Sequence, residues 1–149
     1  MTHIYDDARL IDCARMLAPH DRDDMRRLAN LIYLADWRCT LTSGHQITRV
    51  SWTFSPSGPN TGPVELCLAQ IDGLRGGLLR RLFHPFAPSP LEGPARAACA
   101  HVARSTADLD PLAFHRLVIS TWPVITCDRH DQDPSLETLA LEYAERMPA

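Results

Sequence analysis

The sequence has no lysine, and all 15 of its basic residues are arginine. Arginine forms bidentate, weakly hydrated contacts and is enriched at protein interfaces, whereas lysine prefers solvent. Acidic residues number 18, and the net charge of −3 argues against a nucleic-acid-binding protein, which usually carries a basic face. The arginines therefore suit contacts with protein better than contacts with nucleic acid.

Long apolar runs are absent too. No stretch approaches the roughly 20 apolar residues that cross a bilayer. The first ten residues, MTHIYDDARL, are acidic and polar, unlike a signal or transit peptide. We therefore expect a cytoplasmic protein with no membrane partner. A chain of 149 residues that is 45% hydrophobic and 22% charged fits one domain spanning residues 1–149.

Paired cysteines are also missing. The five cysteines are odd in number and scattered, with no C-x-x-C pair, which favours reduced and mostly buried thiols. Cys127 and His130, with Cys99 and His101 upstream, supply enough ligands for a tetrahedral zinc site. Their spacings, C-x-x-H and C-x-H, match no common zinc signature, so we expect no metal and no cofactor.

Catalytic signatures are absent from the chain. It has no G-x-G-x-x-G, P-loop, H-E-x-x-H or G-x-S-x-G pattern, and its histidines are dispersed. We therefore expect a protein that is not an enzyme. A small enzyme or metal-binding protein built on Cys127 and His130 stays as an alternative of a different class.

Apolar periodicity predicts about six helices. The second one, with Asp21 as N-cap and Gly44 after its last turn, is apolar on nearly every side, because only Asn30 and Asp36 are plainly polar between Leu28 and Trp37. Such a helix is packed by several neighbours. The six expected helices cover residues 6–18, 20–44, 64–71, 90–104, 111–119 and 135–147. The expected N-caps of the last three are Ser89, Asp110 and either Asp133 or Ser135.

Extended and irregular segments separate the helices. QITRVSWTF (46–54) predicts a short strand or extended segment, and SPSGPNTGP (55–63) predicts a loop. Gly76 and Gly77 fit the turn of a tight hairpin, and STWPVITCDRHDQDP (120–134) predicts a second structured loop. The predicted fold is mainly α: a compact single-domain helical bundle with a short β-strand or hairpin element.

Three segments in this order resemble the Panacea domain of SocA-like antitoxins and related phage-encoded proteins. They are LIYLADWRCTLTSGHQITRVSW, SGPN before a helix, and RLVISTWPVITCDR followed by LETLALEYAE. The family's Leu-Leu-Tyr-Phe-Ala-Asp-like helix corresponds to 31–36, its Gly-x-x-Ile-Thr turn to 44–48 and its Tyr-Gly-Pro-Val-like loop to 57–60. Residues 61–64 are an alternative match for that loop. The resemblance covers about residues 23–145.

The resemblance implies an antitoxin that binds and neutralises a cognate toxin encoded nearby. An alternative within the family is a proteolytic adaptor, which would bring an ATP-dependent protease as a second partner. Aromatic, arginine and adaptable polar residues at the ends of elements have the composition of an interface hot spot. The residues expected to contact the toxin are Trp37, Arg38, His45, Gln46, Trp52, Ser57, Gly58, Pro59, Asn60 and Trp122. The C-terminal helix from Leu136 is the alternative surface.

Overall fold

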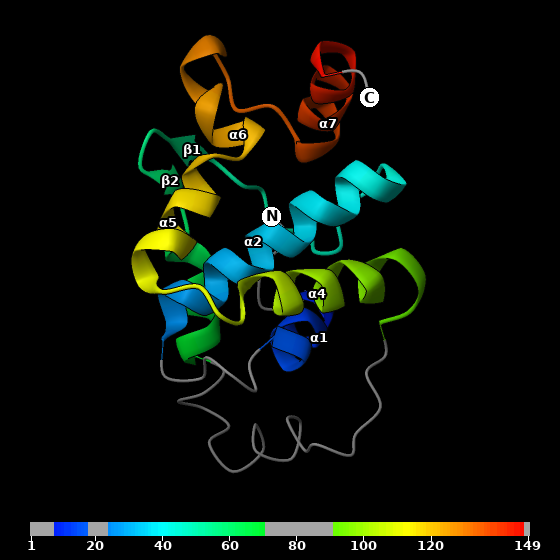
Figure 1. The fold of residues 1–149 in the computed structure, drawn as a ribbon, viewed down its shortest axis with the longest axis vertical. Helices are drawn as coiled ribbons and strands as arrows, with labels where there is room; N and C mark the ends of the chain where they lie inside the picture. Colours follow the sequence, from blue (N-terminus) through cyan, green and yellow to red (C-terminus); the bar gives the residue numbers. More distant parts are fainter. Residues whose placement is uncertain (1–7, 18–23, 71–90, 148–149) are drawn as a thin grey trace.

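The computed structural model describes residues 8–17, 24–70 and 91–147. Helix α2 (Met25–Ser43) runs through the middle of the molecule, with α7 (Leu136–Arg146) on one side and α1 (Ala8–Leu17) and α4 (Gly93–Thr106) on the other (Figure 1). All residues from 31 to 37 are buried. The prediction that this helix is the centre of a mainly α, compact fold is confirmed.

The ends of α2 follow from its capping residues. The Asp24 carboxylate accepts the backbone N–H of Arg27 at 3.0 Å, so Asp24 is the N-cap. The expected N-cap, Asp21, lies outside the described residues. Gly44 adopts φ 85° and donates its backbone N–H to the Thr40 carbonyl at 2.9 Å, as expected for the left-handed residue after a helix.

Helices α1 and α4 cover one side of α2. α1 lies within the predicted range 6–18. α4 begins at Gly93 and ends at Thr106, so it starts and ends later than the predicted range 90–104. Glu92 stands at the N-cap without a side-chain hydrogen bond, while the expected cap, Ser89, lies outside the described residues. The buried thiols of Cys13 and Cys99 lie 4.0 Å apart where the two helices meet.

Of the short strand or extended segment predicted over 46–54, only Phe54 lies in a strand, and residues 46–53 have no regular secondary structure. Only β1 (Phe54–Ser55) pairs, antiparallel, with β2 (Gly58–Pro59), so part of the predicted loop is a hairpin strand. The backbone between 46 and 52 bonds to side chains instead of to a second strand. Its partners include the Gln46 amide, whose Nε2 donates to the carbonyls of Thr48 and Val50 at 2.8 Å each.

The remaining helices agree more closely with the prediction. Residues 62–70 are helical, close to the expected 64–71, and the predicted turn at Gly76 and Gly77 lies outside the described residues. Asp110 caps α5 (Pro111–Ile119) by accepting the backbone N–H of Ala113 at 2.8 Å. Ser135, one of two expected caps, accepts the backbone N–H of Thr138 at the start of α7 at 3.2 Å.

The second predicted loop is partly helical. It forms a one-turn helix, α6 (Trp122–Ile125), followed by a 3-10 turn, η3 (Cys127–Arg129). Tyr33 of α2 holds this region, because its hydroxyl contacts the Thr121 hydroxyl at 2.7 Å while its ring packs edge-on against Trp52 at 5.5 Å between centroids. Within the described part of the chain, no helix is long and apolar enough to span a membrane.

Candidate functional site

Asp36 is the polar residue that interrupts the apolar surface of α2, and its carboxylate is fully buried. Oδ1 accepts the backbone N–H groups of Ile47 (2.8 Å) and Thr48 (2.9 Å). Oδ2 accepts the Thr48 hydroxyl (2.5 Å) and the Trp52 indole N–H (2.9 Å). Asp36 therefore fixes the segment after Gly44 onto α2 and explains why this apolar helix carries a carboxylate.

Burial dominates the protonation of Asp36. Removal from water raises the pKa of the carboxyl to about 6, although the hydrogen bonds from Thr48, Trp52 and Ile47 act in the opposite direction. All four hydrogen bonds come from donors of the protein itself, and a carboxylate has about four acceptor positions. The Asp36 carboxylate therefore stabilises the fold and has no free acceptor position for a ligand.

Two of the predicted partner-binding tryptophans are in the core, so the expectation that they contact a partner is wrong. Trp52 is buried and donates to Asp36. Trp37 is 6% exposed and packs edge-on against Tyr143 of α7, with 6.2 Å between ring centroids. Both residues were predicted at the surface because they lie near the ends of elements. In the structure their indoles are buried in the core.

Gln46 and Gly58 are also used within the fold. The backbone N–H of Gln46 donates to the Glu137 carboxylate at 3.2 Å, and its side-chain amide donates to backbone carbonyls. Gly58 is buried in β2, and its φ of 130° suits glycine. Neither residue offers a free recognition group.

The other predicted residues reach the surface but do not form one site. Arg38 and His45 are exposed towards the C-terminal end of α2, where Arg38 lies near His101 of α4. Burial and the charges of Arg38 and Arg104 lower the pKa of His101. The hairpin lies beside α6, away from that end of α2 (Figure 1). Its predicted residues are exposed Ser57, half-buried Pro59 and exposed Asn60.

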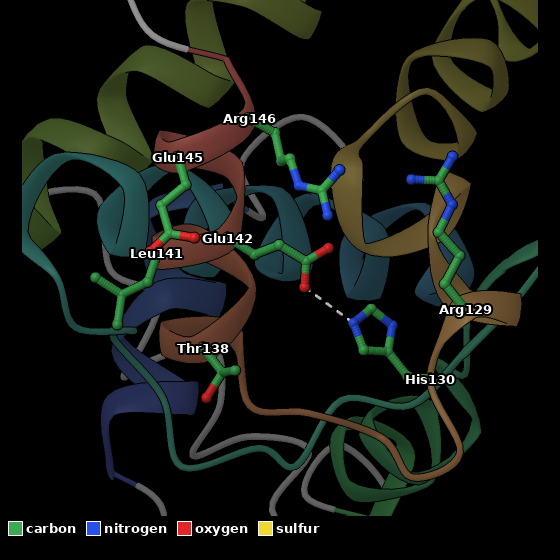
Figure 2. A pocket seen from close by; sticks show the side chains of 7 residues that line it. All are labelled: Arg129, His130, Thr138, Leu141, Glu142, Glu145 and Arg146. Carbon is green, nitrogen blue, oxygen red and sulfur yellow. Dashed lines mark hydrogen bonds and ion pairs between the residues drawn. The ribbon is translucent and has the colours of Figure 1, made fainter.

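A groove of about 520 Å³ lies between α7 and the segment that follows α6 (Figure 2). Leu141 is 71% exposed, the highest value among the exposed large hydrophobic residues that the structure describes. The lining residues come from η3, from the residue after it and from α7: Arg129, His130, Thr138, Leu141, Glu142, Glu145 and Arg146. This is the alternative surface that the sequence indicated from Leu136 onwards.

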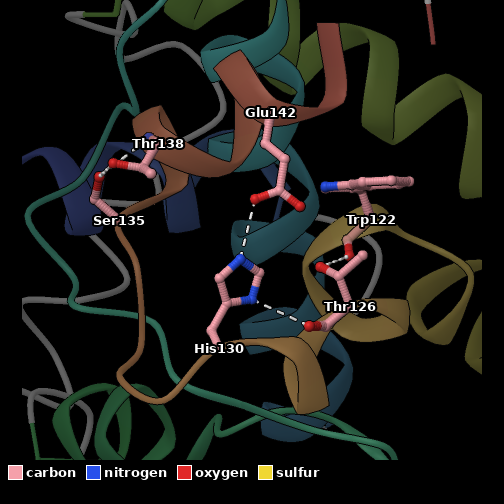
Figure 3. A network of polar contacts seen from close by, with 6 residues as sticks. All are labelled: Trp122, Thr126, His130, Ser135, Thr138 and Glu142. Carbon is pink, nitrogen blue, oxygen red and sulfur yellow. Dashed lines mark hydrogen bonds and ion pairs between the residues drawn. The ribbon is translucent and has the colours of Figure 1, made fainter. Parts of the chain in front are cut away.

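His130 connects the two sides of the groove (Figure 3). Its Nδ1 lies 3.1 Å from the Thr126 carbonyl oxygen, and its Nε2 lies 3.0 Å from Oε2 of Glu142. Both neighbouring atoms are acceptors, so both contacts are hydrogen bonds only when both ring nitrogens carry hydrogen. His130 therefore has an acceptor atom beside each of its ring nitrogens.

Trp122 lies behind this pair. Its ring packs edge-on against Tyr143, with 5.6 Å between centroids, and Tyr143 also contacts Trp37. The indole nitrogen of Trp122 is buried and has no hydrogen-bond partner among the described residues. Figure 3 shows that nitrogen pointing towards Glu142. Trp122 does not line the groove, but its indole nitrogen faces Glu142, which does.

Charged side chains in the groove are largely uncompensated. Arg129, Glu145 and Arg146 are exposed, and no ion pair joins them to any other residue in the described ranges. The two guanidinium groups extend towards the same end of the groove (Figure 2). Glu145 and Leu141 lie across from them on the α7 side. The groove therefore has a basic end and an acidic edge with an apolar residue.

The Cys127 thiol gives no sign of activation as a nucleophile. Burial and the neighbouring Asp128 carboxylate raise the pKa of Cys127, which opposes formation of a thiolate. Cys99, its suggested co-ligand, is buried against Cys13. In the portion of the chain that the structure describes, no three His, Cys, Asp or Glu side chains are grouped to hold a metal ion.

A second groove, of about 450 Å³, separates the start of α2 from α5. Arg27 lines it and donates from Nη2 to the carbonyls of Thr106 (3.2 Å) and Leu109 (3.3 Å). Its guanidinium carbon also lies 4.2 Å from the centroid of the Phe114 ring. Arg27 therefore connects α2 to the end of α4 and to α5, so its role in this groove is to stabilise the fold.

Sequence reasoning missed most of the residues in the groove between η3 and α7. His130 and Glu142 are 12 positions apart and on different elements, so no spacing rule pairs them. The exposure of Leu141 could be predicted from the sequence, because this leucine lies outside the apolar stripe of its amphipathic helix. Comparisons of the chain with protein families, curated proteins and solved structures find no match.

Proposed function

We propose that the protein is an antitoxin that binds a cognate toxin protein, encoded nearby, through the groove between η3 and α7. The observation that carries the proposal is the exposure of Leu141 beside uncompensated charges in one groove. An apolar residue surrounded by charged groups that can pair with a partner has the composition of a protein interface.

The surrounding fold supports a binding role. Thr138, Leu141, Glu142 and the charged residues that follow them are carried by a helix, and Tyr143 of that helix packs against two tryptophans. A rigid helix presents side chains with little loss of conformational entropy on binding. Ile125 of α6 and Met147 after α7 are also exposed, at 56% each.

The resemblance to SocA-like antitoxins supplies the class of partner. It implies a toxin that is neutralised by direct binding, and the groove provides a surface for that binding. His130 has both ring nitrogens engaged, so the same groove offers little for acid–base catalysis. Binding is therefore the function that its geometry supports best.

Co-expression with the protein encoded beside this gene tests the proposal. Wild type should restore growth of cells that express the toxin, and Leu141→Asp should not, because it buries an unpaired charge in the interface. Leu66→Asp is the matched control, since Leu66 is also more than half exposed but lies in the helix at 62–70. Circular dichroism checks that both variants are folded.

Full rescue by Leu141→Asp would contradict the proposal. Arg38→Glu distinguishes the groove from the surface that the sequence indicated: it should still rescue, because Arg38 lies at the α2–α4 edge. Repeating the assay in cells that lack ATP-dependent proteases separates direct neutralisation from delivery to a protease. Rescue that disappears in those cells would identify an adaptor.

A further inference from the structure

We infer that the basic end of the groove binds a carboxylate side chain of the partner protein, and that Glu142 occupies part of this position in the free protein. The inference rests on the proposed function and names the chemistry that the groove would recognise. It follows from an excess of hydrogen-bond donors at one end of the groove and from the pairing of His130.

Three donor groups in or beside the groove lack an acceptor among the described residues. Arg129 and Arg146 have no ion-pair partner among the residues that the structure describes, and their guanidinium groups extend towards the same end (Figure 2). The third group, the indole N–H of Trp122, is buried without a partner within those same residues. A buried N–H without an acceptor costs free energy, so an incoming acceptor is favoured there.

Glu142 is the groove carboxylate that pairs with His130. Its Oε2 lies 3.0 Å from Nε2 of His130, and the two side chains are 28% and 22% exposed, so a ligand can reach the pair. Figure 3 shows the Trp122 indole nitrogen directed towards the same carboxylate. A partner carboxylate can thus displace Glu142 from His130 and accept from His130, Trp122 and an arginine together.

The opposite edge of the groove gives the partner its orientation. Glu145 and Leu141 lie across the groove from the arginines (Figure 2). Glu145 repels a carboxylate at that edge, and Leu141 offers an apolar contact. The groove therefore fits a segment that places an acidic residue between the arginines and an apolar residue over Leu141.

Short blocked peptides test this inference without the toxin. The probe is a peptide that contains a Leu-Glu pair between glycines, and its counterpart carries Gln in place of Glu. Binding is followed through the Trp122 indole N–H resonance, assigned by its loss in Trp122→Phe. The Leu-Glu peptide should shift this resonance and bind about tenfold or more tightly than the Leu-Gln peptide, because only Glu forms an ion pair with an arginine.

Two variants should act in opposite directions. Combined Arg129→Ala and Arg146→Ala should weaken binding of the Leu-Glu peptide about tenfold, since both charge-assisted contacts are lost. Glu142→Gln should strengthen it several-fold, because the competing negative charge is removed. The matched controls are Arg104→Ala on α4 and Glu92→Gln at its N-cap, both exposed positions, which should leave the affinity unchanged.

Weaker binding by Glu142→Gln would overturn the inference, and so would equal binding of the two peptides or no binding of either. Tighter binding of inorganic sulfate than of the Leu-Glu peptide would also overturn it, because the site would then select small anions. Toxin neutralisation that is lost in Leu141→Asp but kept in the double arginine variant would contradict the inference and leave the proposed function standing. Peptide binding as described, without toxin neutralisation by wild type, would contradict only the proposed function.

Discussion

Asp36 shows how a single buried charge can organise an entire segment. Its carboxylate receives four hydrogen bonds from three residues of the segment that follows α2. These bonds replace the strand pairing that the sequence of residues 46–54 suggests. A pattern of alternating β-branched and aromatic residues describes burial correctly at Ile47, Val50 and Trp52. It contains no information about which group accepts the backbone hydrogen bonds.

Asp36→Asn should lower the free energy of unfolding by about 2–4 kcal/mol. Asparagine offers one oxygen and one NH₂ group, so its NH₂ would face donors from Thr48 or Trp52. Urea denaturation measures the loss, and Asp108→Asn on the exposed surface after α4 is the control that should stay near wild type. Equal stability of Asp36→Asn and wild type would show that the four hydrogen bonds contribute little.

The pKa of Asp36 predicts the pH dependence of this difference. Burial raises the pKa from 3.8 to about 6, so between these pH values the folded protein keeps a proton that the unfolded chain loses. The stabilisation from protonated Asp36 is complete below pH 4 and is lost as pH rises through 6. The stability advantage of wild type over Asp36→Asn should therefore shrink between pH 4 and pH 7 in urea titrations. An advantage that grows over this range would contradict the prediction.

At the scale of elements, periodicity and capping predicted the helices but not the short elements. Asp110 and Ser135 cap α5 and α7 as expected, because the capping bond is local in sequence. The hairpin depends on Gly58, and α6 is a single turn beside it that contacts β1. Such short elements are stabilised by tertiary contacts, which the local sequence does not encode.

Gly58→Ala should destabilise the protein by about 1–3 kcal/mol. The backbone of Gly58 has φ 130°, a conformation that an L-residue adopts with strain, even though an added Cβ would meet only Val118 at 3.9 Å. Thermal denaturation measures the effect. Ser57→Ala on the exposed turn is the neighbouring control and should change stability little. A stable Gly58→Ala protein would show that the hairpin relaxes at low cost.

Tyr143→Ala should separate α7 from the rest of the fold at a cost of about 2–4 kcal/mol, because its ring contacts the indoles of Trp37 and Trp122. Tyr143→Phe keeps the ring and should retain most of the stability. Tryptophan fluorescence during urea denaturation reports both variants, since two of the three tryptophans contact this ring. If both variants lose equal stability, the hydroxyl is responsible and the ring contacts are not.

At the scale of the whole molecule, the sequence predicted the core better than the recognition surface. The apolar helix through Leu34 identified the centre of the fold, because burial follows hydrophobic periodicity. The groove depends on where α7 lies relative to η3, and this placement arises from contacts between residues far apart in the chain. Trp37 and Trp52 were expected at the surface and are buried, because composition alone does not separate a buried indole from an exposed one.

Site-specific photocrosslinking with the protein encoded beside this gene tests the central claim most directly. A photoreactive phenylalanine analogue replaces Leu141 in the groove or, as a control, Leu112 on α5, which is 59% exposed. Both variants are co-expressed with the toxin and irradiated in cells, and the crosslinked species are identified by mass spectrometry. We predict a crosslink to the toxin from position 141 and none from position 112. A crosslink from position 112 alone would place the interface on α5 and contradict the account.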